Sequence, residues 1–144
     1  REIGLAIREL GIENINKNLK LKITKYNASK GQEYFIEITN NQDILFGLLR
    51  LRLFKDKENN QRAIIRELHV YGQSLKLKQK SQELASQHKG FGKQLLKKAE
   101  EICKQKNVSD IKIISGVGVR EYYKRLGYNL TSKEDGEYMI KYIN

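Results

Sequence analysis

The chain is poor in the residues that build disulfides, zinc sites and membrane spans. It has one cysteine, two histidines and no proline or tryptophan in 144 residues. One cysteine excludes an internal disulfide framework, and the cysteine and histidines together are too few for a usual zinc site. No apolar run is long enough to span a bilayer, and residues 1–10 do not read as a signal peptide. We therefore expect an intracellular, cytoplasmic protein with no membrane partner and no metal site.

Neither a repeat nor a proline-rich or low-complexity linker interrupts the chain, and its length suits one domain spanning residues 1–144. Its net charge is +11. A positive excess of this size attracts polyanions, nucleic acid first, although cationic proteins without that role exist. Lys76, Lys78 and Lys80 lie in a polar connector over residues 72–86 and would add to RNA binding. The charge therefore favours an RNA partner.

Alternating apolar and polar residues predict strands in the first half of the chain. Leu19, Leu21 and Ile23 alternate with polar residues, which is the period of a strand. Further strands are expected over 34–39, 44–54 and 63–70, and turns over 27–32 and 56–61. On the last of these strands, we expect Glu67 and His69 to face one side of the sheet, and Arg66 and Leu68 the other. The four strands form an antiparallel meander.

The second half alternates helices and strands. A helix is predicted to end near residue 106, with an apolar face formed by Phe91, Leu95, Ala99, Ile102 and Cys103. This placement makes Cys103 a core thiol. A strand over 110–115, a short helix over 120–126 ended by Gly127, and strands over 128–130 and 138–143 follow. The order indicates an α/β fold whose mixed, mostly antiparallel sheet is flanked by helices.

Two glycines, Gly90 and Gly92, stand at the beginning of the long helix. The first turn of a helix has unpaired backbone N–H groups and the positive end of the macrodipole. Glycines leave these amides bare, so a phosphate can approach them, and a positive φ is a further possible reason for glycine. An ordinary glycine turn is the alternative. The pattern predicts an anion site made by this loop, Gln87, His88, Lys89, Gly90, Phe91, Gly92, Lys93 and Gln94.

Three sequence blocks together resemble one known family. They are Arg66-Glu67-Leu68-His69-Val70-Tyr71-Gly72, the loop Gln87-His88-Lys89-Gly90-Phe91-Gly92, and Ile114-Ser115-Gly116-Val117-Gly118-Val119-Arg120-Glu121-Tyr122-Tyr123. The loop is similar to the acyl-CoA pyrophosphate loop of GNAT acetyltransferases. The combination resembles the acetyltransferase domain of the catalytic subunit of Elongator, a tRNA-modifying enzyme. The likeness covers nearly the whole chain.

The resemblance implies the GNAT acyl-CoA N-acyltransferase fold, splayed between the fourth and fifth strands to admit acetyl-CoA. In that family acetyl-CoA supplies the carbon of a carboxymethyl-type group on the wobble uridine of tRNA. The family's preceding radical S-adenosylmethionine domain, with its iron–sulfur cluster, has no counterpart in this sequence. The chain is therefore expected to be a C-terminal piece whose partners are acetyl-CoA, tRNA and that radical domain.

The same resemblance implies roles for particular residues. The backbone of Glu67, Leu68, His69 and Val70 would pair with the pantetheine arm, and amides of Phe91, Gly92, Lys93 and Gln94 would bind the pyrophosphate. A tyrosine near the thioester would protonate the leaving thiolate, a suitable role for a phenol of ordinary pKa about 10. Tyr123 is the first candidate, with Tyr122 as its neighbour.

The group that activates the acceptor is left open by the sequence. Glu67 and His69 together could act as a base, or Glu67 could pair with a nearby lysine or arginine. His88 is expected to position the cofactor rather than to react. Two other functions remain open: acetylation of protein lysines, as by a histone-type acetyltransferase, and binding of acetyl-CoA and RNA without turnover.

Overall fold

The computed structural model describes residues 18–71, 90–114, 119–131 and 138–143. Its first half is the predicted antiparallel meander of four strands. These are β1 (Lys20–Ala28), β2 (Gly31–Thr39), β3 (Leu45–Lys55) and β4 (Gln61–Val70). The turn expected over residues 27–32 is shorter than predicted, because Ser29 and Lys30 alone join β1 to β2, both with positive φ. Positive φ at both central residues is the geometry of a tight hairpin turn.

The second half also follows the predicted order. It contains α4 (Phe91–Gln105), β5 (Asp110–Ile114), α5 (Arg120–Arg125), β6 (Asn129–Leu130) and β7 (Tyr138–Tyr142). The seven strands form one sheet in the order β1-β2-β3-β4-β5-β7-β6, and only β4 and β5 pair in parallel. Gly127 follows α5 with a φ of +96°, as expected for a helix end.

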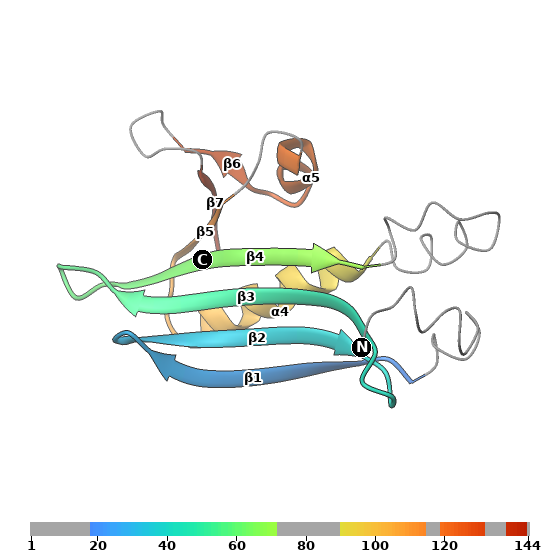
Figure 1. Cartoon of the computed structure of the whole chain (residues 1–144). Helices are drawn as coiled ribbons and strands as arrows, with labels where there is room; N and C mark the ends of the chain where they lie inside the picture. Colours follow the sequence, from blue (N-terminus) through green and yellow to red (C-terminus); the bar gives the residue numbers. More distant parts are fainter. Residues whose placement is uncertain (1–17, 72–89, 115–118, 132–137, 144) are drawn as a thin grey trace.

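Helix α4 lies across one face of the sheet, behind β2, β3 and β4 in the view of Figure 1. Its apolar side is buried in the common core through Phe91, Leu95, Leu96, Ala99, Ile102 and Cys103. Phe91 meets Phe46 of β3 edge to face, with 6.2 Å between the ring centroids. Burial of each large apolar side chain contributes about 1.5–3 kcal/mol to stability. None of the described helices is long and apolar enough to cross a membrane.

Cys103 is fully buried on this helix, which confirms the predicted core thiol. Burial, followed by the nearby carboxylates of Glu100 and Asp110, raises the pKa of the Cys103 thiol to about 12. Alkylating reagents react with the thiolate. We therefore expect no labelling of the folded chain by iodoacetamide at pH 8, and labelling of its single cysteine in denaturant. Mass spectrometry measures both, and rapid labelling without denaturant would contradict this packing of α4.

Candidate active site

Strands β4 and β5 separate after a short pairing. Ala63, Ile64 and Ile65 pair with Ile111–Ile113, and β4 then continues to Val70 without a partner on β5. Beyond Ile65, the backbone groups of β4 that face β5 are therefore not used by that strand. The opening is the splay predicted between the fourth and fifth strands. It leaves an edge of β4 on which an extended, amide-bearing ligand can form strand-like hydrogen bonds.

Among the residues that the structure describes, no polar side chain caps the first turn of α4. Gly90 is the N-cap residue, there is no side-chain cap hydrogen bond, and the first turn has no acidic residue. The N–H of Gln94 donates to the carbonyl oxygen of Gly90 at 3.0 Å. Gln94 is thus engaged within the helix, and the helix offers no acceptor of its own to the amides of Phe91, Gly92 and Lys93. The amides of Gly92 and Lys93 can therefore bind an anion.

The two glycines have different surroundings. A Cβ at Gly90 would meet no atom of the described residues within 4 Å, whereas a Cβ at Gly92 would collide with the hydroxyl of Tyr122 and lie 3.6 Å from Val70. Gly90 has a φ of −88°, so the expectation of a positive φ is wrong at this position. The need for a small residue at Gly92 comes instead from packing against α5. Gln87, His88 and Lys89 lie outside the described residues.

Tyr122 and Tyr123 of α5 face different surroundings. Tyr123 is 6% exposed and packs edge to face between Tyr122 and Tyr128, at centroid distances of 5.4 and 6.1 Å. Tyr122 is half-buried, and its hydroxyl lies against Gly92 at the beginning of α4. Burial raises the pKa of both phenols, and Arg125 acts in the opposite direction on Tyr122. Both phenols are therefore protonated at neutral pH, and Tyr122 is the one that contacts the glycine loop.

Glu67 and His69 contact each other on β4, on the side of the sheet away from α4. His69 Nε2 lies 2.9 Å from Glu67 Oε1, and Arg50 of β3 lies 3.5 Å from Glu67 Oε2. His69 also stacks on Tyr71, with 6.1 Å between the rings. The sequence left open whether Glu67 acts with His69 or pairs with a basic residue, and in the structure its carboxylate contacts both a histidine and an arginine. The cross-strand partner Arg50 was not predicted, because pairing between strands leaves no local sequence signal.

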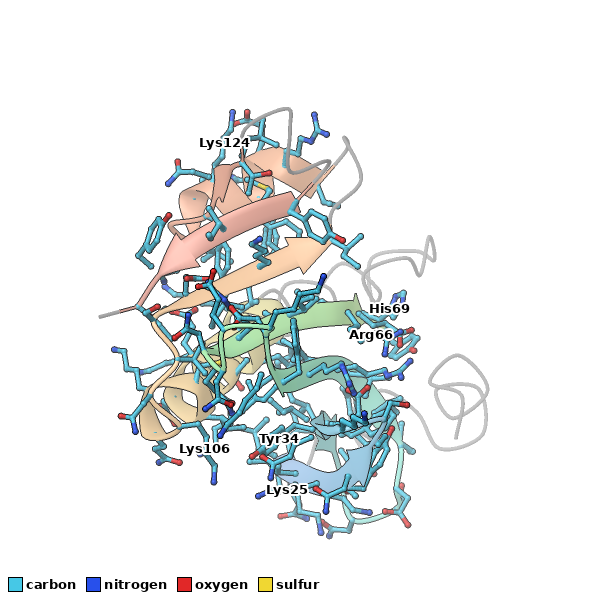
Figure 2. The ribbon with its side chains drawn as sticks, turned by 90° about the vertical axis from the view of Figure 1, so that its left-hand side faces the viewer. Lys25, Tyr34, Arg66, His69, Lys106 and Lys124 are labelled. Atoms are coloured by element: carbon cyan, nitrogen blue, oxygen red, sulfur yellow. The ribbon has the colours of Figure 1, made fainter. Side chains whose placement is uncertain are left out.

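The prediction that Arg66 faces away from Glu67 is wrong. The register of β3 and β4 shifts between Arg50, which pairs with Glu67, and Leu51, which pairs with Ile65. This β-bulge leaves Arg66 without a partner on β3, and it changes the alternation of side chains along β4. Arg66 reaches the buried Glu33 at 3.2 Å, and Figure 2 shows Arg66 and His69 close together near the end of β4. Leu68 packs against the core as predicted.

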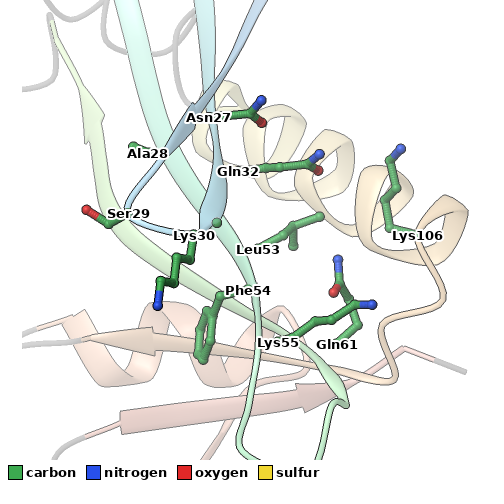
Figure 3. Close-up of a pocket in the computed structure, with 11 residues that line it drawn as sticks. Asn27, Ala28, Ser29, Lys30, Gln32, Leu53, Phe54, Lys55, Gln61 and Lys106 are labelled. Carbon is green, nitrogen blue, oxygen red and sulfur yellow. The ribbon is translucent and has the colours of Figure 1, made fainter.

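A separate cavity of about 590 Å³ lies at the other end of α4. Figure 3 shows the cavity between Lys106, just after the helix, and the β1–β2 hairpin, with Lys55 and Gln61 also in its lining. Lys30 is a third lysine of its lining, and none of the described lining residues is acidic. Because it adjoins the C-terminal end of α4, this cavity is not part of the opening between β4 and β5.

The fold and the loop at α4 define a class of protein. Residues 82–144 match the acetyltransferase (GNAT) domain. With the mixed seven-stranded sheet and the opening between β4 and β5, this match identifies the chain as a GNAT acetyltransferase domain. The fold predicted from the sequence is confirmed.

Comparisons over the whole chain narrow the family. The chain is 38% identical to tRNA uridine(34) acetyltransferase of Methanocaldococcus jannaschii, over 99% of the chain and 27% of that protein. It is 40% identical to Elongator complex protein 3 of Schizosaccharomyces pombe, over 96% of the chain and 27% of that protein. Among solved structures, it matches the archaeal Methanocaldococcus infernus Elp3 with a TM-score of 0.74 and 34% identity, over 99% of this chain and 34% of that one.

Over nearly its whole length the chain is therefore similar to one part of the tRNA uridine(34) acetyltransferases and of Elongator complex protein 3, which confirms the resemblance seen in the sequence. It spans about a quarter of the length of these curated relatives.

Proposed function

We propose that this chain binds acetyl-CoA and cleaves its thioester, supplying the acetyl group for a carboxymethyl-type modification of the wobble uridine of tRNA. The observation that carries the proposal is the first turn of α4, which no described side chain caps, beside the part of β4 that does not pair with β5. An anion-binding helix end next to a free strand edge suits a ligand that has both phosphates and amides. Acetyl-CoA is such a ligand, and the names of the relatives supply the tRNA acceptor.

In this proposal the pyrophosphate lies on the first turn of α4, at the amides of Gly92 and Lys93. The pantetheine arm continues along β4, where backbone groups between Glu67 and Val70 take the place of a neighbouring strand. The thioester then lies near α5, and a tyrosine hydroxyl protonates the leaving thiolate. Because Tyr122 is only half-buried while Tyr123 is buried between two other rings, we assign the proton donor to Tyr122 first. Gln87, His88 and Lys89 remain proposed contacts of the phosphates.

Glu67 is the proposed base on the acceptor side of the opening. Its carboxylate is half-exposed and lies within 2.9 Å of His69, so the two side chains can share a proton taken from an acceptor or from water. Arg50 holds the second carboxylate oxygen at 3.5 Å. This arrangement fixes the direction of the carboxylate, which leaves His69 as the more exposed member of the pair.

The remaining steps of the modification are assigned to another part of the protein. The chain spans 27% of its curated relatives, and the radical chemistry, with S-adenosylmethionine and an iron–sulfur cluster, belongs in this proposal to a preceding radical domain. Binding of tRNA is shared between that domain and this one, whose net charge of +11 favours contact with phosphates. The proposed location is the cytoplasm.

Release of free CoA from acetyl-CoA tests the function. The assay compares tRNA, a lysine-containing peptide and no acceptor, with this chain alone and with this chain fused to the preceding region of the archaeal relative. We expect tRNA to accelerate CoA release by the fusion and the peptide to have no effect, because the acceptor is a nucleoside. Acetylation of the peptide, detected by mass spectrometry, would support the protein lysine acetyltransferase instead. Binding of acetyl-CoA without release under any condition would indicate a binding module.

A further inference from the structure

A row of planar side chains crosses the face of the sheet away from α4. It begins on β1, where Tyr26 stacks on Phe35 of β2, with 5.8 Å between the ring centroids and 21° between the ring planes. The Arg50 guanidinium of β3 follows, 5.2 Å from the centroid of the Phe35 ring. Glu67 joins Arg50 to the stacked histidine and tyrosine described above. This planar row consists of Tyr26, Phe35, Arg50, His69 and Tyr71.

Strand register places the planar row on one face of the sheet. Phe35 pairs with Arg50, and Arg50 pairs with Glu67, so these side chains point to the same side. The neighbouring Ile36 and Leu49 point to the other side and are buried in the core with α4. Figure 1 shows the face of the planar row toward the viewer, with α4 behind it. Neither of the two described helices covers the planar row there.

The planar row is open to solvent at both ends. Tyr26 is 40% exposed, and the side chain of His69 is 52% exposed. Exposed rings on an open sheet can stack on the flat bases of a ligand, which is a common way for proteins to bind single-stranded nucleic acid. The shape and exposure of the row therefore suit unpaired bases.

Two arginines beside the planar row share one buried carboxylate. Arg66 and Arg52 lie 3.2 and 3.5 Å from Glu33 Oε1. The Glu33 side chain is only 5% exposed, whereas that of Arg66 is 48% exposed. One carboxylate balances one of the two positive charges and holds both guanidinium groups at the surface of the sheet. Guanidinium groups held in this way can contact phosphates.

The charge of the whole face has the same sign. Basic residues outnumber acidic ones on this face of β1–β4: Lys20, Lys22, Arg50, Arg52, Arg62 and Arg66 against Glu33, Glu37 and Glu67. A positive surface attracts a polyanion. The charge therefore favours nucleic acid as the partner of this face.

We propose that this face binds single-stranded RNA, with bases stacked along the planar row and phosphates against Arg52 and Arg66. The direction of the strand rests on the proposed function, because the row leads to Glu67 and His69, the proposed base on the acceptor side. The wobble uridine belongs to a single-stranded loop of tRNA. Nucleotides next to the acceptor would therefore lie along the planar row, where unpaired bases can stack.

Fluorescence anisotropy with a short labelled RNA strand, and with the duplex that it forms with its complement, tests the assignment. We expect the chain to bind the single strand more tightly, because only unpaired bases can stack. Tyr26→Ala is expected to weaken binding of the single strand at least about fivefold, the lower limit for the loss of one stacked base. Binding of the duplex, which uses phosphates alone, is expected to change little. Tyr26 is exposed on the edge strand, so thermal melts are expected to match the wild type.

Tyr26→Phe and Tyr142→Ala are the matched controls. Tyr26→Phe keeps the ring, and Tyr142 is a 72% exposed tyrosine of β7 outside the planar row. We expect both variants to bind the single strand as the wild type does. Unchanged binding by a folded Tyr26→Ala variant, or an equal loss in Tyr142→Ala, would overturn the inference. Equal weakening of single strand and duplex by Tyr26→Ala would also overturn it, because stacking would not be the cause.

The fusion to the preceding region of the archaeal relative separates this inference from the proposed function. If Tyr26→Ala weakens RNA binding by the chain alone but not by the fusion, the preceding region covers this face and the RNA assignment is wrong. If tRNA accelerates CoA release but RNA binding does not depend on Tyr26, the surface is wrong and the proposed function stands. If RNA binding depends on Tyr26 but tRNA does not accelerate CoA release, the surface stands and the proposed function is wrong.

Discussion

Tyr122→Phe is expected to slow acetyl-CoA thioester cleavage by about two to four orders of magnitude, the usual cost of a lost general acid. Binding of acetyl-CoA is expected to weaken by no more than about tenfold, because one neutral hydrogen bond contributes about 0.5–1.5 kcal/mol. The ring keeps its packing against Tyr123 and the core, and only the hydroxyl beside Gly92 is lost. Release of free CoA, measured with tRNA in the fusion to the preceding region, gives the rate, and titration gives the affinity.

Tyr123→Phe is the matched control on the adjacent residue. Its ring is buried between Tyr122 and Tyr128, so loss of its hydroxyl is expected to leave cleavage unchanged. If Tyr123→Phe cleaves acetyl-CoA slowly and Tyr122→Phe cleaves it at the normal rate, Tyr123 is the proton donor. Normal cleavage by both variants would show that water or another group protonates the thiolate.

Gly90→Asp is expected to abolish acetyl-CoA binding while the fold is kept. A Cβ at this position meets no described atom within 4 Å, and an acidic residue at a helix N-terminus is favourable. The same carboxylate lies where the pyrophosphate is proposed to bind. Two like charges about 4 Å apart near a protein surface repel by about 4 kcal/mol, which corresponds to an affinity loss of about 100- to 1,000-fold.

Gly90→Asn provides the control, because it has nearly the same shape without the charge. The difference in acetyl-CoA affinity between the two variants, measured by titration, separates charge repulsion from steric exclusion. Thermal melts show whether both variants are folded. Undiminished affinity in a folded Gly90→Asp variant would show that the pyrophosphate does not lie on the first turn of α4.

Periodicity predicted the elements of this fold well, because each strand and helix has a local apolar pattern. The alternation of Leu21 and Ile23 with polar residues predicted β1, and the apolar face ending at Cys103 predicted α4. Turn geometry was harder, since Ser29 and Lys30 adopt positive φ without the asparagine or glycine typical of that turn. The bulge at Arg66 depends on how β4 pairs with β3. The sequence of β4 alone therefore does not predict it.

The same distinction between local sequence pattern and tertiary packing holds for the residues of the candidate site. The glycine loop was predicted because its residues are contiguous, and the pairing of Glu67 with His69 because they are two apart on one strand. Arg50 was missed as a contributor. It meets Glu67 across a strand pair. Such contacts depend on tertiary packing, so sequence spacing does not predict them.

The contact between Tyr122 and Gly92 couples two distant sequence blocks, because the residue type allowed at one position depends on the residue at the other. A side chain at Gly92 would collide with the Tyr122 hydroxyl, and a smaller residue at Tyr122 would leave the glycine facing empty space. A side chain at Gly92, or a residue without an aromatic ring at Tyr122, would therefore disturb this contact. An engineer who transplants the glycine loop into another scaffold must therefore transplant the tyrosine helix with it.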